Sequence, residues 1–152
     1  MRRIVPFFLL LLLIVTSCKK GGSDIENVDP RDQYLGVYDV DYSSRTVVGT
    51  INTNGDSGKG TITISKGNAA DELQLAVVFP DYNGTELAKL NGSKFTMGRT
   101  RQQIKIYNAT YDGEYNGTGS FDGKNLTITA VVKSNQNGTP IEWIQNWKGL
   151  RR

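Results

Sequence analysis

Carboxylates two residues apart are the side chains of this sequence whose spacing could support acid–base chemistry. Asp39 and Asp41 form one such pair, and Asp112 and Glu114 form another. On a strand, residues two apart share a face, and glycoside hydrolysis needs two carboxylates about 5–10 Å apart, one with its pKa raised by burial. Both pairs alternate with the apolar positions of their segments, so we expect them to face solvent and to have no catalytic role.

The chain of 152 residues contains no histidine. It therefore lacks the commonest general base and the commonest metal ligand, and its serines have no histidine to activate them. Gly55–Gly60 superficially resembles a phosphate loop, but it lacks the Gly-Lys-Ser/Thr ending, so we expect a hairpin loop there. We expect a protein that is not an enzyme and that binds no metal and no cofactor.

Cys18 is the only cysteine, which excludes disulfides within the chain. It follows a basic start, Arg2 and Arg3, and an apolar run from Ile4 to Val15. A helix of about 12 residues spans about 18 Å, less than the roughly 30 Å of a bilayer core. The run is therefore typical of a secretory signal rather than of a membrane-spanning helix.

The segment Val15-Thr16-Ser17-Cys18 resembles the lipobox of bacterial lipoproteins, in which an aliphatic residue and two small residues precede a cysteine. The resemblance implies a signal peptide over residues 1–17, cleavage between Ser17 and Cys18, and a diacylglyceryl group on the Cys18 thiol. Two acyl chains anchor a protein stably, so a membrane is the expected partner. The alternative is an ordinary secretory signal that ends at a cysteine by chance.

Residues 18–29 predict a lipidated N-terminus followed by a flexible tether, because Lys19-Lys20-Gly21-Gly22-Ser23 has the composition of a linker. Surface-exposed lipoproteins of the Bacteroidetes type carry acidic residues directly after the cysteine, whereas the first acid here is Asp24. We therefore expect a cell-envelope protein anchored in the outer membrane and favour a periplasm-facing position over surface exposure. The 18 basic side chains, two of them in the leader, nearly balance the 15 acidic ones, so nucleic acid is not an expected partner.

Residues 30–152 predict one all-β domain. Asp29-Pro30 favours a short helical turn over Pro30–Tyr34, and polar and apolar residues alternate with a period of two after it. We expect about eight or nine antiparallel strands. The segments with strand character are Gly36–Tyr42, Thr46–Asn52, Lys59–Ser65, Leu73–Phe79, Glu86–Leu90, Lys94–Met97, Gln102–Tyr107, Ala109–Phe121, Asn125–Lys133 and Ile141–Lys148.

Short connections favour an antiparallel meander, and closing it into a barrel would hide its edges. A two-sheet sandwich is the alternative. Tyr34-Leu35-Gly36-Val37-Tyr38, Gly117–Phe121 and Gly123–Thr129 are similar to segments of small Bacteroidetes lipoproteins with a lipocalin-like or calycin-like barrel. The resemblance implies a fold more than an activity. The sequence departs from lipocalins in having Tyr38 where their Gly-x-Trp motif has tryptophan, and no arginine is assigned to pack on it.

Aromatic side chains are the strongest indication of a binding site. They either fill a small barrel or hold an apolar or sugar ligand, and we assign ligand contact to Tyr111, Tyr115 and Trp143. Aromatics and glycines share one face of Ala109–Phe121, which favours curvature or a close backbone approach. The aromatic set is Tyr38, Tyr42, Tyr111, Tyr115, Phe121, Trp143 and Trp147.

The sequence thus favours a non-enzymatic, lipid-anchored envelope protein that binds a small apolar ligand or a partner protein in or on its barrel. The alternative is a structural, interaction or inhibitor module that acts through exposed loops such as Ser43–Thr46 and Asn135–Pro140. A hydrolase comes third, because it would need a buried carboxylate in a cleft.

Overall fold

The computed structural model describes residues 28–80 and 82–152. The predicted signal peptide, the Ser17–Cys18 cleavage site, the lipid on Cys18 and nearly all of the predicted tether lie outside these residues. Within the described part of the chain, no helix combines the length and the apolar character needed to cross a membrane.

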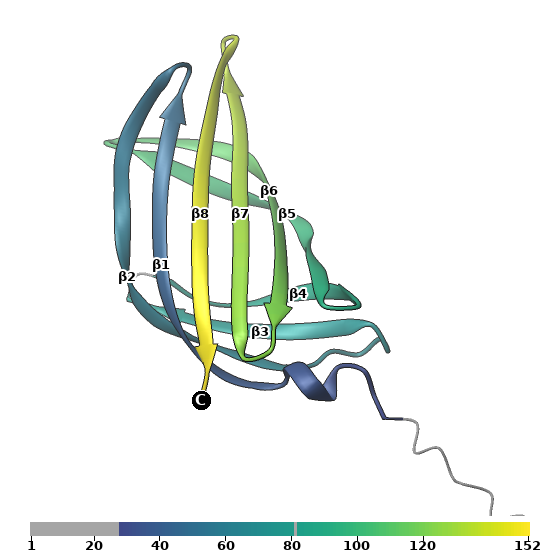
Figure 1. The fold of residues 1–152 in the computed structure, drawn as a ribbon. Coiled ribbons are helices and arrows are strands. Elements are labelled where there is room, and N and C mark those ends of the chain that lie inside the picture. The colour runs from purple at the N-terminus through teal and green to yellow at the C-terminus, as the bar shows by residue number, and fades with distance from the viewer. Residues whose placement is uncertain (1–27, 81) are drawn as a thin grey trace, which may run out of the picture.

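Eight antiparallel strands follow one another around a closed barrel, in which β1 pairs with both β2 and β8 (Figure 1). A short 3-10 helix, η1 (Asp32–Tyr34), precedes them. The barrel confirms the predicted all-β meander and excludes the sandwich. The strands are β1 (Gly36–Val48), β2 (Ile51–Lys66), β3 (Glu72–Phe79), β4 (Tyr82–Asn91), β5 (Lys94–Ile106), β6 (Ala109–Asp122), β7 (Asn125–Gln136) and β8 (Thr139–Arg151).

Alternation of apolar and polar residues places each strand's apolar side chains inside the barrel. In β7, Leu126, Ile128, Ala130 and Val132 are buried, and most residues between them are exposed. The odd-numbered positions of β3 behave in the same way. Burying one large aliphatic side chain stabilises a fold by about 1.5–3 kcal/mol, so the pattern fixes which face of each strand turns inward.

The predicted break between the first two strand segments is wrong. β1 continues to Val48 through an irregularity at which its register with β2 shifts between Ser43 and Arg45. The chain turns only at Gly49, whose φ is +60°. Ser43–Thr46 is therefore part of a strand and not an exposed loop, because a local register shift bends a strand without ending it.

The predicted hairpin loop at Gly55–Gly60 is also wrong, because these residues lie inside β2. The glycines leave room for aromatic rings. A Cβ on Gly58 would come within 2.9 Å of the Tyr42 hydroxyl, and one on Gly60 would overlap the Phe79 ring. Glycine therefore marks close packing here and not a turn.

Two other predicted strands, Lys94–Met97 and Gln102–Tyr107, join into the single strand β5, whose register with β6 shifts between Met97 and Thr100. Only the first part of β5 pairs with β4, over four residue pairs from Ala88↔Met97 to Asn91↔Lys94. The barrel wall is therefore continuous at one end and open between β4 and β5 toward the other.

Helix η1 closes one end of the barrel. The Tyr34 ring stacks on Phe121 with ring centroids 4.3 Å apart, and its hydroxyl donates to the carbonyl of Gly92 over 3.1 Å. Arg31, which is 9% exposed, donates to the backbone carbonyls of Ala69 and Glu72 and so fastens η1 to the β2–β3 connection. The predicted helical turn over Pro30–Tyr34 is confirmed.

The C-terminal strand supplies an arginine to this closed end. Arg151 pairs in register with Tyr38, and its side chain donates to the backbone carbonyl of Gln33. Its aliphatic stem lies 3.3 Å from where a Cβ on Gly36 would stand. Arg151 thus packs on the Gly-x-Tyr segment of β1. The sequence alone did not identify this arginine.

Candidate functional site

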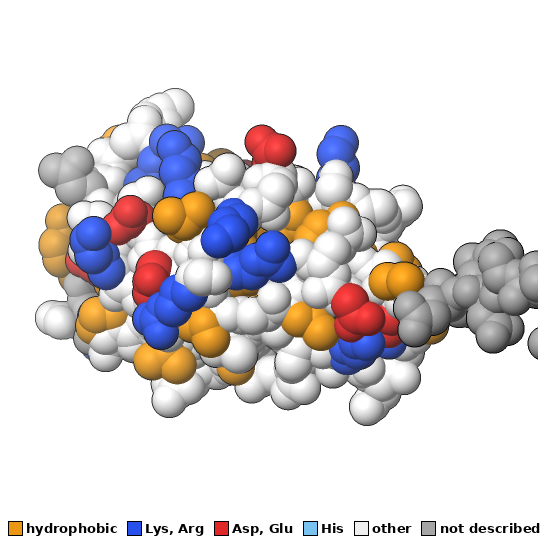
Figure 2. Space-filling view, turned by 60° about the horizontal axis from the view of Figure 1, so that its bottom comes forward, with side chains coloured by type: hydrophobic (Ala, Val, Ile, Leu, Met, Phe, Trp, Pro, Cys, Tyr) orange, Lys and Arg blue, Asp and Glu red, His pale blue; other side chains and the backbone are white. Residues whose placement is uncertain are grey.

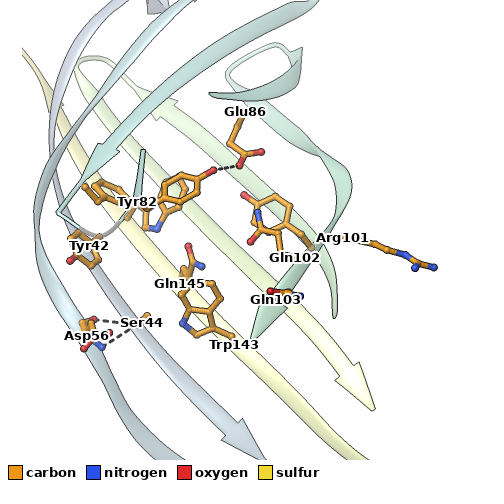
Figure 3. A pocket seen from close by; sticks show the side chains of 13 residues that line it. Tyr42, Ser44, Asp56, Tyr82, Glu86, Arg101, Gln102, Gln103, Trp143 and Gln145 are labelled. Carbon is orange, nitrogen blue, oxygen red and sulfur yellow. Dashed lines mark hydrogen bonds between the residues drawn. The ribbon is translucent and has the colours of Figure 1, made fainter. Parts of the chain in front are cut away.

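A cavity of about 460 Å³ lies in the barrel, on the side away from the residues that contact η1. Figure 3 shows the side chains that line it. This volume is within the range of about 300–1,000 Å³ that is typical of small-molecule sites. Strands from both sides of the barrel contribute to its wall. The lining residues are Tyr42, Ser44, Asp56, Phe79, Tyr82, Glu86, Arg101, Gln102, Gln103, Tyr115, Trp143, Gln145 and Trp147.

The mouth of the cavity follows from the strand register. Tyr82 to Leu87 of β4 have no partner on β5, and residues 51–60 of β2 have no partner on β3. The short β3–β4 hairpin therefore leaves the wall incomplete beside it. Tyr82 and Glu86 lie on one rim of this gap, and Gln102 lies on the other (Figure 3).

Three aromatic rings form a packed wall on one side of the cavity. Tyr42 stacks on Phe79 at 4.6 Å between ring centroids, and Phe79 meets Trp147 edge-on at 5.2 Å. Trp143 and Tyr82 make no ring contact with any aromatic in the described part of the chain. These two rings therefore have faces available to a ligand.

A carboxylate stands beside one of those two rings. The Tyr82 hydroxyl donates to Oε1 of Glu86 over 2.6 Å (Figure 3). Burial, and then the hydrogen bond to Glu86 and its charge, raise the pKa of Tyr82. Deeper in the barrel, burial raises the pKa of Tyr115, whose hydroxyl lies 3.2 Å from the Met97 sulfur. Both phenols are therefore neutral at physiological pH.

Some of the other polar lining groups hold the strands together, and others are free to bind a ligand. The Ser44 hydroxyl accepts from the backbone N–H of Asp56 over 3.1 Å and so ties β1 to β2 where their register shifts. Arg101 is exposed and points away from the cavity (Figure 3). Gln102 and Gln145 are half-buried and point into it (Figure 3). The lining therefore holds two carboxylates, Glu86 beside the Tyr82 ring and Asp56 on β2.

The structure brings together two of the three predicted ligand residues. Tyr115 and Trp143 line the cavity, whereas Tyr111 does not, because it packs half-buried against the hydrophobic core beyond it. The other aromatic residues of the predicted set lie at different levels of the barrel. Tyr38 and Phe121 fill the closed end, where their ring centroids are 6.2 Å apart, while Tyr42 and Trp147 line the cavity.

Sequence reasoning missed Phe79, Tyr82, Glu86, Gln102 and Gln145 as site residues. A signal existed for the two glutamines. Each occupies an inward position of a strand whose other inward positions are apolar or aromatic, and a polar side chain on such a face is more informative than an exposed apolar one. No such sequence signal exists for Tyr82 and Glu86. They border the cavity only because β4 pairs with β5 from Ala88 onward and leaves residues 82–87 at an open edge.

The carboxylate pairs lie outside the cavity, as predicted. Asp39 and Asp41 of β1 and Asp112 and Glu114 of β6 are all exposed. Asp39 bonds to Arg152 at 2.7 Å, and this hydrogen bond lowers the pKa of Asp39. In residues 28–80 and 82–152, no three acidic side chains converge in a way that could hold a metal ion.

Fold and cavity together define a closed eight-stranded antiparallel barrel, consistent with the lipocalin-like barrel predicted from the sequence. The chain matches no protein-family model, and no curated protein shows significant sequence similarity to it.

Proposed function

We propose that this barrel is the ligand-binding domain of a lipid-anchored envelope protein. The carrying observation is the cavity of about 460 Å³ with unstacked aromatic faces and polar groups on its wall. A barrel of eight strands is just wide enough to be filled by side chains or to hold one small ligand. Here side chains fill one end and leave the other hollow.

The proposed anchor and the opening of the cavity lie at opposite ends of the barrel. The chain enters through η1, at the closed end, and β8 ends there too (Figure 1). A lipid on Cys18 would therefore hold the closed end toward the membrane and leave the cavity accessible from the aqueous side. This arrangement supports a binding protein that meets its ligand in solution.

Tryptophan fluorescence tests the binding proposal directly, since both tryptophans of the chain, Trp143 and Trp147, line the cavity. We expect a saturable change in emission when the purified full chain is titrated with its ligand class. A panel of fatty acids, aromatic compounds and soluble sugars would cover the chemistry of the wall. No saturable response to any of them would contradict a small-molecule function.

The anchor has a separate test. Replacing Cys18 with alanine is expected to move the protein from the membrane fraction to the soluble fraction. Mass spectrometry of the mature N-terminus should show an acylated residue 18. An unmodified cysteine at that position would contradict the anchor and leave ligand binding untouched.

The alternative of an interaction module depends on exposed loops. Of its two proposed loops, only Asn135–Pro140 lies at a turn, the β7–β8 hairpin, where Asn137 and Gly138 have positive φ. On the face in Figure 2, Lys and Arg side chains lie among acidic and apolar ones. Exposed aromatic side chains in the described part of the chain are Tyr82 and Tyr107, and the first belongs to the cavity. These observations favour the cavity over a docking patch.

A further inference from the structure

The cavity wall carries hydrogen-bonding groups that the protein itself does not use. Within residues 28–80 and 82–152, the side-chain amides of Gln102 and Gln145 and the indole N–H of Trp143 make no hydrogen bond. Oε2 of Glu86 is likewise unoccupied, because Tyr82 donates to Oε1. None of these atoms is sealed from solvent, since no buried side-chain N or O atom of the described residues lacks a partner.

A purely apolar ligand fits this wall poorly. It would displace water from two amides, an indole N–H and a carboxylate oxygen without replacing the lost hydrogen bonds. A buried polar group left without a partner costs about 1–3 kcal/mol, and a charged one costs more. The occupant must therefore bring both donors and acceptors: donors for Glu86 and the amide oxygens, and acceptors for the Trp143 N–H and the amide nitrogens.

The same occupant must also present an apolar face to the rings. Trp143 and Tyr82 line the cavity, and no other aromatic ring of the described residues stacks on either of them. A sugar ring has both properties, since its C–H groups form an apolar face and its hydroxyls, each a donor and an acceptor, project around the rim. The gap between β4 and β5 would let a longer glycan leave the cavity sideways.

The charges of the lining residues restrict the chemical class of the ligand further. Two carboxylates, Glu86 and Asp56, line the cavity, and the basic lining residue Arg101 points away from the rings (Figure 3). A uronic or other acidic sugar would bring a like charge against Glu86, which disfavours it in a partly dehydrated site. A neutral sugar would instead donate hydroxyl hydrogens to that carboxylate.

From these contacts we propose that the cavity binds a neutral sugar ring, stacked on Trp143 or Tyr82 and hydrogen-bonded by Gln102, Gln145 and Glu86. This proposal rests on the proposed function, that the cavity takes a small ligand, and names the chemical class of that ligand.

The purified full chain would be titrated with neutral hexose oligosaccharides, with uronate oligosaccharides and with palmitate, using tryptophan emission as the readout. We expect saturable binding of a neutral oligosaccharide and none of the uronates. The double variant Glu86→Gln/Asp56→Asn should remove the discrimination and allow uronate binding, because it neutralises both carboxylates of the lining.

Variants locate the site. Gln102→Leu and Gln145→Leu should each weaken sugar binding about tenfold, because each loses a hydrogen bond and buries a sugar hydroxyl without a partner. Gln74→Leu is the matched control, since Gln74 is exposed on β3 and lies outside the cavity. Trp143→Phe keeps an aromatic face if Trp143→Ala fails to fold, and it should weaken binding less than the alanine variant.

Three results would overturn the sugar proposal. Saturable palmitate binding without glycan binding would refute the ligand class while retaining a small-molecule function. Glycan binding that Gln102→Leu and Gln145→Leu leave unchanged would place the sugar elsewhere. No response to any of the three probes would refute the sugar proposal, and only a further lack of response to aromatic compounds would refute the small-molecule function as well.

Discussion

Glycines and aromatic rings are matched as pairs across the inside of this barrel. A Cβ on Gly119 would overlap the Phe95 ring, just as Cβ atoms on Gly58 and Gly60 would meet Tyr42 and Phe79. Each glycine yields the space that a large ring on the neighbouring strand occupies. In a barrel of only eight strands, this pairing lets rings pack inside without widening the wall.

Replacing Gly119 with alanine tests this pairing. The new methyl group would strike Phe95, so we expect the free energy of unfolding to fall by about 1–3 kcal/mol, as is typical of overpacking. Gly98→Ala is the control, because nothing lies within 4 Å of a Cβ there and its φ is not positive. Urea denaturation measures both variants, and equal midpoints for the two would contradict the pairing.

The same residues show why turns were harder to predict than strand faces. Gly92 and Gly123 have φ of +62° and +57° and form the turns that their Asn-Gly and Asp-Gly signals predict. Gly58 and Gly60 have no positive φ and lie within β2. Sequence shows that a position is glycine but not whether its backbone or its missing side chain is the reason.

The short helix η1 is attached to the barrel by side chains that reach distant parts of the chain. It stacks Tyr34 on the core, while Arg31 reaches three backbone carbonyls of the β2–β3 connection. Lys66 of β2 bonds to Asp29 at 3.0 Å and to Asp32 at 2.6 Å. The predicted helical turn was correct, but its role as a plug depends on distant partners, such as Gly67, which is 36 residues from Arg31, and local sequence patterns cannot show them.

Removing the Tyr34 ring should open the closed end. Tyr34→Ala is expected to lower the free energy of unfolding by about 3–5 kcal/mol, the usual cost of truncating a buried aromatic side chain. Tyr107→Ala should change it by no more than about 0.5 kcal/mol, because Tyr107 is 90% exposed. Chemical denaturation compares the two, and similar losses would contradict the plug.

Acid should loosen the attachment of η1. The hydrogen bonds from the Arg31 side chain and then from its backbone N–H lower the pKa of Asp29. The unfolded chain has an ordinary value of about 3.9, so this contribution to stability is complete above about pH 4 and is lost as the pH falls through the lowered native pKa. Asp29→Asn should therefore flatten the acid limb of stability against pH. An unchanged slope in denaturation series below about pH 4 would count against this coupling.

At the scale of the whole molecule, the barrel is closed by hydrogen bonds at one end and incomplete beside β4 at the other. The closed meander was predictable, since alternation and short connections leave few ways to hide an edge. The cavity was not, because it depends on how far β3 and β4 extend relative to their neighbours. Trp143 and Tyr115 could be selected as candidate lining residues because they are aromatic. Tyr82 and Glu86 could not, because their place at the cavity depends on the pairing of β4 with β5 beginning only at Ala88.

Hydrogen exchange tests the open wall. Residues 51–60 of β2, apart from the register shift at Gly55 and Asp56, and residues 100–106 of β5 pair with a strand on one side only. Their amides that face the gap should exchange faster than those of β7, which pairs on both sides. A saturating ligand in the cavity should slow the exchange along the gap. Uniform protection across all eight strands would contradict the incomplete wall.

The pairing of β1 with β8 has a consequence for how the protein is made. It places Tyr38 opposite Arg151, and the adjoining side-chain bond from Arg152 to Asp39 joins residues 113 positions apart. Contacts so distant in sequence form late and slowly, so the barrel cannot close while its last strand is still being synthesised. A chain shortened before Thr139 would leave β1 and β7 as open edges that favour aggregation. Completion of β8 is therefore the step at which an aggregation-prone chain with exposed strand edges becomes a closed barrel.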